Sequence, residues 1–116
     1  MTSRGTPPGV PGSFDVHSVD SGEWWCRVTL SGELDMATGP QFRAVVDAAL
    51  SRDRRHIAVD ASGLTFIDSS GLVALLSARE QAMALEGSLR LTAASPAVLR
   101  VLDMAGVADE LLDQRH

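Results

Sequence analysis

The sequence contains no lysine and a single cysteine, and each shortage excludes a class of protein. A phosphate-binding loop of the Walker A type needs a lysine, so this class of nucleotide-binding protein is excluded. Cys26 alone cannot form an internal disulfide. The three histidines, at positions 17, 56 and 116, lack the Cys/His spacing that is typical of metal sites. The residue pattern therefore predicts neither a cofactor nor a bound metal.

Long apolar runs and clusters of basic residues are also missing. The longest nearly uncharged apolar run, residues 71–78, is far shorter than the ~18–20 residues of a membrane helix. The N-terminus lacks a basic segment followed by an apolar core, so we expect no secretory signal. The net charge is −5, without any basic block that could contact nucleic-acid phosphates. We expect a cytoplasmic protein that binds neither a membrane nor nucleic acid directly.

The length and overall composition of the chain are typical of one small globular domain. The chain has 116 residues, of which 45% are hydrophobic and 22% are charged. Residues 1–13 hold three of the five prolines and three of the ten glycines, without apolar periodicity. This composition predicts a flexible leader at 1–13 and a folded domain over 14–116.

The first half of the domain predicts two strands, a helix and a short third strand. Apolar and polar residues alternate over 14–19 and 25–30, which predicts a hairpin with Cys26 on the buried face. Residues 31–35 are predicted to form a loop. Thr38 and Gln41 fit a capping box before an apolar helical stripe over 42–50. The arginines of segment 51–56 are then expected to offset the helix dipole. The apolar segment 57–59 predicts an interior strand.

The second half continues the alternation of strands and helices. Residues 60–67 are predicted to form a loop, with or without a further extended piece, followed by a helix over 72–86. The predicted apolar face of that helix consists of Leu72, Leu75, Leu76, Ala82, Met83 and Leu85.

Gly87 is expected to end this helix with a positive φ. Residues 89–93 predict a strand, and Ser95-Pro96 is typical of a helix start before a stripe that ends at Gly106. Residues 107–112 fit either a last strand or a helical turn. The order β-β-α-β-α-β-α predicts an α/β sandwich with a mixed sheet of about four strands.

The segment Asp68-Ser69-Ser70-Gly71 is the strongest candidate for a site, because it joins a strand end to a helix start. Three interpretations compete. Asp and Ser are favoured helix caps, worth ~1 kcal/mol each. A nucleophilic serine needs a base and an oxyanion hole, which the sequence does not indicate. A phosphorylated serine is the third, since a helix N-terminus tolerates added negative charge.

Four acidic residues could also gather at this edge of the sheet. Glu33, Asp35, Asp60 and Asp68 follow or adjoin predicted parallel strands. Together they could bind a metal or act as acid and base. Because the four acidic residues lack the spacing of metal ligands, the more ordinary explanation is that they are solvated loop residues and helix caps.

Five segments of the chain together form a recognisable pattern: Gly32-Glu-Leu-Asp35, Thr38 with Pro40, Asp60-Ala-Ser-Gly-Leu-Thr-Phe-Ile-Asp-Ser-Ser-Gly-Leu72, Ser95-Pro-Ala97 and Leu102-Asp-Met-Ala-Gly106. In these segments the chain resembles a known family, the STAS domains, and more narrowly the bacterial anti-sigma factor antagonists. The resemblance covers about residues 14–112 and is most specific over residues 60–72. It implies a mixed sheet of four to five strands with helices mainly on one side.

The resemblance also implies a regulatory function rather than an enzymatic one. Such antagonists bind an anti-sigma factor serine kinase and thereby free a sigma factor. The kinase phosphorylates the serine after the Asp of the motif, which is Ser69 here, and a serine phosphatase reverses the modification. The partner-binding residues that the resemblance implies are Glu33, Asp35, Asp68, Ser69, Ser70 and Gly71.

Two other functions stay open on the sequence. One is a STAS scaffold or sensing subunit of a larger signalling assembly, and the other is a small hydrolase or nucleotide-using enzyme. We expect a monomer or a weak homodimer, which a measurement of molecular mass would distinguish from a large assembly.

Overall fold

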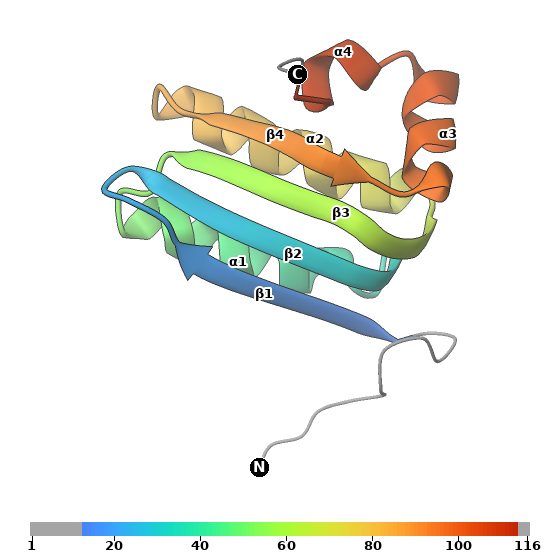
Figure 1. Ribbon diagram of the computed structural model, residues 1–116, viewed down its shortest axis with the longest axis horizontal. Coiled ribbons are helices and arrows are strands. Elements are labelled where there is room, and N and C mark those ends of the chain that lie inside the picture. The colour runs from blue at the N-terminus through green and yellow to red at the C-terminus, as the bar shows by residue number, and fades with distance from the viewer. Residues whose placement is uncertain (1–12, 114–116) are drawn as a thin grey trace.

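The sheet and helices of the computed structural model, which describes residues 13–113, alternate in the predicted order (Figure 1). The elements are β1 (Phe14–Asp20), β2 (Trp25–Leu34), α1 (Gly39–Ser51), β3 (His56–Ile67), α2 (Ser69–Ala84), β4 (Ser88–Ala94), α3 (Pro96–Ala105) and α4 (Ala108–Leu111). Most of the leader predicted at 1–13 lies outside the described residues. Ser13 is described and buried, and its carbonyl oxygen accepts a 2.8 Å hydrogen bond from the Glu33 amide. The ordered fold therefore includes Ser13.

The four strands lie in the order β1-β2-β3-β4. β1 and β2 form the predicted antiparallel hairpin, whereas β2, β3 and β4 are parallel. Helices α1 and α2 cover one face of this sheet, and α3 and α4 follow β4 at its edge (Figure 1). The predicted mixed α/β architecture, with helices mainly on one side, is confirmed.

β2 and β3 are longer than predicted. β2 continues through the segment 31–34, which we predicted to be a loop, and β3 continues to Ile67. Register shifts between Thr29 and Ser31 and between Gly32 and Glu33 accommodate the interrupted alternation. Gly32 adopts φ +94 at this irregularity, a conformation that glycine tolerates. The glycine and polar residues therefore mark bulges within the strands.

The core lies between the sheet and the two covering helices. Cys26 is fully buried there, as predicted. In α2 the predicted apolar face is partly wrong, because Met83 and Leu85 are about half exposed while Ala74 and Ala78 are buried. The small alanines allow close packing, so the buried face of α2 follows size as well as hydropathy.

The helix ends agree with the sequence at α3 and differ from it at α1. Ser95 Oγ accepts a 3.3 Å hydrogen bond from the Val98 amide, and Gly106 ends α3 with φ +72, both as predicted. Thr38 occupies the N-cap position of α1, but its side chain makes no cap hydrogen bond, so the predicted capping box with Gln41 is wrong. The Thr38 hydroxyl instead donates to the Glu33 carbonyl oxygen at 2.8 Å.

No basic residue lies in the last turn of α1, but Arg52 is its C-cap residue, so the effect of these arginines on the helix dipole stays a prediction. Arg52 and Arg54 pair with Asp20 at 2.8 and 3.3 Å, and Arg55 pairs with Asp53 at 2.9 Å. The hydrogen bond from Arg52 is the main cause that lowers the pKa of the Asp20 carboxyl, and a nearby Arg54 charge acts in the same direction. The two ion pairs with Asp20 bind the loop after α1 to the end of β1, whereas the Arg55–Asp53 pair lies within that loop.

The structure tests two further predictions, the positive φ of Gly87 and the conformation of the tail over residues 107–112. The positive φ predicted for Gly87 is found at Glu86, with φ +63. Gly87 is needed for another reason: a Cβ there would overlap the Arg55 carbonyl group. The tail forms the helical turn α4, and Leu112 pairs with Leu91 in an isolated bridge.

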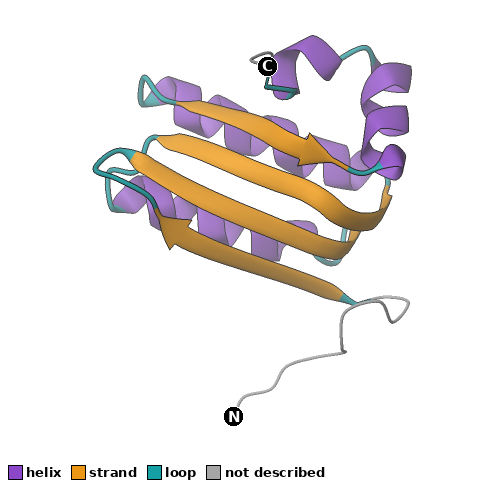
Figure 2. Ribbon diagram, in the orientation of Figure 1, coloured by secondary structure: helices purple, strands orange, loops and turns teal. Residues whose placement is uncertain are grey.

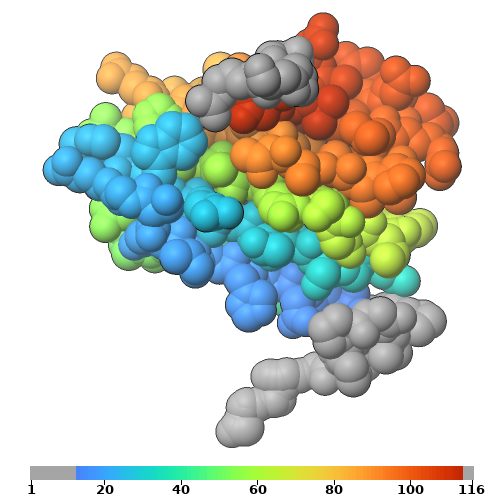
Figure 3. Space-filling model, in the orientation of Figure 1, coloured from blue at the N-terminus to red at the C-terminus, as the bar shows by residue number. Residues whose placement is uncertain are grey.

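In the part of the chain that the structure describes, no helix crosses the middle of the strands on the sheet face opposite α1 and α2 (Figure 1). Side chains of all four strands therefore lie side by side on the surface, as the blue, cyan, green and orange bands in Figure 3 show. On this face Trp25 stacks against His56, with ring centroids 5.0 Å apart.

Candidate functional site

The candidate site forms where β2 and β3 end. The loop from β2 to α1 and the junction of β3 with α2 lie at the same end of the sheet (Figure 2). Parallel neighbouring strands necessarily bring their carboxyl ends together. The motif around Ser69 and the loop that begins at Asp35 therefore become neighbours.

Asp68 caps helix α2, which begins at Ser69, three residues earlier than predicted. Its Oδ1 accepts a 2.9 Å hydrogen bond from the Gly71 amide, and its own backbone is extended, with φ −114 and ψ −171. This is the geometry of an N-cap, so the capping interpretation is confirmed for Asp68. The Asp68 carboxylate is thereby held at the helix start and is half-buried.

Gly71 fixes the position of that helix start against the sheet. It is buried, and a Cβ at this position would overlap the carbonyl oxygen of Leu34, the last residue of β2. The Asp68 amide also lies 3.4 Å from the same oxygen. Only glycine allows this approach, so Gly71 has a structural role in setting Ser69 and Ser70 beside the end of β2.

Asp35 is held by a network within its own loop. Its Oδ1 accepts hydrogen bonds from the amides of Ala37 and Thr38, at 3.0 and 3.1 Å. The Asp35 amide in turn donates to Thr38 Oγ1 at 3.0 Å. Asp35 and Thr38 therefore shape the loop, and much of the hydrogen-bonding capacity of the Asp35 carboxylate is used inside the protein.

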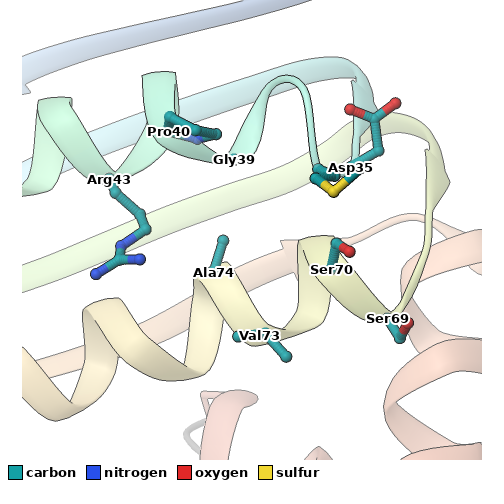
Figure 4. Close-up of a pocket in the computed structure, with 9 residues that line it drawn as sticks. Asp35, Gly39, Pro40, Arg43, Ser69, Ser70, Val73 and Ala74 are labelled. Carbon is teal, nitrogen blue, oxygen red and sulfur yellow. The ribbon is translucent and has the colours of Figure 1, made fainter.

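Ser69 and Ser70 line a surface hollow of about 310 Å³ between α1 and α2 (Figure 4). Ser69 is exposed and Ser70 is half-buried. Neither hydroxyl has a hydrogen-bond partner among residues 13–113. The other lining residues are Asp35, Met36, Gly39, Pro40, Arg43, Val73 and Ala74. The Ser69 side chain is thus exposed at the edge of the hollow.

The six predicted site residues occupy three kinds of position relative to the hollow. Asp35, Ser69 and Ser70 line the hollow, whereas Asp68 and Gly71 support it from the helix start. Glu33 lies in β2 outside the lining and is half-buried.

Sequence reasoning missed Met36, Arg43 and Val73. Met36 and Val73 could have been found in the sequence. Met36 is a large apolar residue in a polar loop, and Val73 lies off the buried stripe of α2, so both are typical of an exposed contact.

The acidic residues do not assemble into a metal site. No group of three or more potential ligands occurs in the described part of the chain. Asp60 lies within β3, well before its end, and accepts hydrogen bonds from the Ser62 hydroxyl at 2.6 Å and the Ser62 amide at 2.9 Å. These bonds lower the pKa of the Asp60 carboxyl. The alternative of four carboxylates meeting at one edge is therefore wrong.

Within residues 13–113, no histidine lines the hollow that holds Ser69 and Ser70. His56 Nδ1 lies 2.9 Å from Ser88 Oγ, at the opposite end of β3 from Ser69.

No described helix is long and apolar enough to cross a membrane.

Comparison with known proteins gives consistent matches along the chain. The family model described as "Mlab, STAS domain" matches residues 17–113. The anti-sigma F factor antagonist of Paenibacillus polymyxa is 37% identical over 81 residues, which cover 69% of each protein.

Solved structures agree in fold. An anti-sigma factor antagonist from Mycobacterium paratuberculosis has a TM-score of 0.78 and 25% identity, covering 91% of this chain and 90% of that one. The unphosphorylated anti-sigma factor antagonist SpoIIAA has a TM-score of 0.74 and 25% identity, covering 88% and 90%. The chain belongs to the STAS domain family, in the group of bacterial anti-sigma factor antagonists.

Proposed function

We propose that the unphosphorylated protein binds an anti-sigma factor serine kinase and so frees a sigma factor, and that phosphorylation of Ser69 switches this binding off. The observation that carries the proposal is the exposed Ser69 hydroxyl at the first residue of α2, directly after the Asp68 cap and beside a hollow. The related SpoIIAA, which is solved in both an unphosphorylated and a phosphorylated form, supports a switch of this kind.

The first turn of α2 can accept a phosphate without unfolding. The leading amides of a helix have no intrahelical acceptor, so those of Ser69 and Ser70 can donate to phosphate oxygens. The helix dipole favours negative charge at the same end. Asp68 adds repulsion, but its carboxylate is already bonded to the Gly71 amide. The fold therefore stays intact while the surface gains about −1.5 to −2 charge units.

In this proposal the protein acts by binding and not by catalysis. The kinase transfers the γ-phosphoryl group of ATP to the Ser69 oxygen and releases ADP. A serine phosphatase hydrolyses the phosphoester and regenerates the binding form. Asp68 and Gly71 act by placing Ser69, whereas Asp35 and Ser70 border the contact surface. Glu33, outside the lining of the hollow, would contact the partner only at its margin.

Phosphosite mapping tests the assignment. The full-length protein is incubated with purified anti-sigma serine kinases and ATP, and mass spectrometry locates the phosphate. We expect phosphate on Ser69, no labelling of Ser69→Ala, and normal labelling of the control Ser18→Ala, because Ser18 is exposed on β1 and lies outside the hollow. Phosphate on Ser3 or Thr6, with Ser69 unmodified, would contradict the proposal.

A further inference from the structure

The hollow beside Ser69 has a narrow floor between two helices. Gly39 of α1 faces Ala74 of α2, and a Cβ on Gly39 would touch the Ala74 Cβ at 3.4 Å. Because both residues are small, the helix starts approach closely and leave a depression above them (Figure 4). A depression of about 310 Å³ can hold one or two side chains of another protein, which is the scale of an interface anchor pocket.

Two large apolar side chains border this depression and remain in water. Met36 is 78% exposed and Val73 is 57% exposed. They come from different segments, the loop after β2 and the first turns of α2. Exposed apolar side chains that converge on one hollow are typical of a contact surface, since covering them releases water from apolar area.

Arg43 is a cation that lines the hollow, and it forms no ion pair within residues 13–113. Its side chain extends from α1 toward α2 (Figure 4). It makes no hydrogen bond or ion pair with any residue of the described range 13–113, whereas Arg52 and Arg55 are both paired with aspartates. The one acid that lines the hollow, Asp35, is bonded to the amides of its own loop.

We infer that this hollow receives an acidic side chain of the anti-sigma kinase, which pairs with Arg43 while a neighbouring apolar residue packs between Met36 and Val73. Charge complementarity carries the choice of partner chemistry, because an unpaired guanidinium fits a carboxylate in a two-point hydrogen bond. The inference rests on the proposed function and specifies how the partner is recognised.

The same arrangement explains how phosphorylation weakens binding. Ser69 and Arg43 line opposite ends of the same hollow (Figure 4), so a phosphate on Ser69 adds a dianion to the hollow that the partner's carboxylate must enter. The phosphate repels that carboxylate and lowers the local positive potential of Arg43. The same hollow thereby contains Arg43, which pairs with the partner's carboxylate, and Ser69, whose phosphorylation weakens binding.

Charge reversal tests this inference. The affinity of the full-length, unphosphorylated protein for a purified anti-sigma kinase is measured by calorimetry for wild type, Arg43→Glu and Arg43→Lys. The matched control is Arg100→Glu, because Arg100 is also exposed, helical and unpaired in the described range but lies on α3, outside the hollow. We expect Arg43→Glu to bind about 100-fold more weakly, Arg43→Lys to lose less, and Arg100→Glu to bind within about twofold of wild type.

A compensating change strengthens the test. Scanning the kinase's surface acids by reversal to arginine should yield one variant that restores binding to Arg43→Glu. Wild-type affinity of Arg43→Glu, or an equal loss in Arg100→Glu, would overturn the inference while leaving the proposed function standing. Failure of the wild-type protein to bind any anti-sigma kinase would instead overturn the proposed function, and this inference with it.

Discussion

Gly71 lies directly against the carbonyl oxygen of Leu34, so the start of α2 is fixed to the end of β2 at a point where no side chain fits. This contact, together with the Asp68 cap, determines where the Ser69 hydroxyl lies. The site is thus built by backbone packing more than by side-chain chemistry. Its parts can be separated by substitution.

Gly71→Ala should destabilise the fold, because the added Cβ overlaps the Leu34 carbonyl and forces the helix start away from β2. We expect a loss of about 1–3 kcal/mol in the free energy of unfolding, the usual range for overpacking. Urea denaturation measures it. Ser70→Ala, one residue earlier, is the control and should change stability by much less. Equal stability of both variants would contradict the close approach.

Asp68→Ala should remove the cap from α2 and cost ~1 kcal/mol, because the Gly71 amide loses its acceptor. Asp68→Asn should retain most of that stability, since its amide oxygen can accept the same hydrogen bond. Thermal unfolding of the two variants distinguishes a capping role from a role of the negative charge. If Asn were as destabilising as Ala, charge and not capping would explain the position.

The ion pair between Asp20 and Arg52 should give a small stability that depends on pH. Arg52 lowers the pKa of the folded Asp20 carboxyl below its ordinary value of 3.8. The contribution is therefore fully present above pH 3.8 and is lost as the pH falls through the lowered pKa. Asp20→Asn should melt slightly below wild type at neutral pH, and the gap should close in strong acid. If the difference in melting temperature between wild type and Asp20→Asn instead grew in acid, the predicted pH dependence would be contradicted.

Cys26 should be unreactive in the folded protein. Burial is the main cause that raises the pKa of its thiol, so the thiolate is scarce, and the side chain is fully buried. A chromogenic disulfide reagent should modify no thiol in the native protein and one per chain in guanidinium. Rapid modification of the native protein would show that this part of the core opens readily.

The sequence predicted the element order better than the strand lengths, and it predicted the caps of α3 but not the capping box of α1. Ser95 and Asp68 were recognisable because capping depends on residues three positions apart. The extension of β2 and β3 was not, because bulges at Gly32 and neighbouring residues break the alternation on which strand prediction depends.

The candidate site was predictable only in part. Ser69 follows from its place between a strand and a helix, and from the resemblance to a family. Arg43 was not foreseen, because Arg43 and Ser69 line one hollow only when α1 and α2 pack side by side at Gly39 and Ala74. Likewise, the ion pair between Arg52 and Asp20 could not be predicted, because these residues lie far apart in the chain. The local sequence shows only that basic residues follow a helix.

The most direct test compares the affinity of the unmodified protein and of the protein quantitatively phosphorylated on Ser69 for the same purified anti-sigma kinase. We expect the phosphorylated form to keep its fold by circular dichroism and to bind about 10²–10³-fold more weakly, equivalent to ~3–4 kcal/mol. Equal affinity of the two folded forms would contradict the account, because the Ser69 hydroxyl would then border a surface that does not respond to its charge.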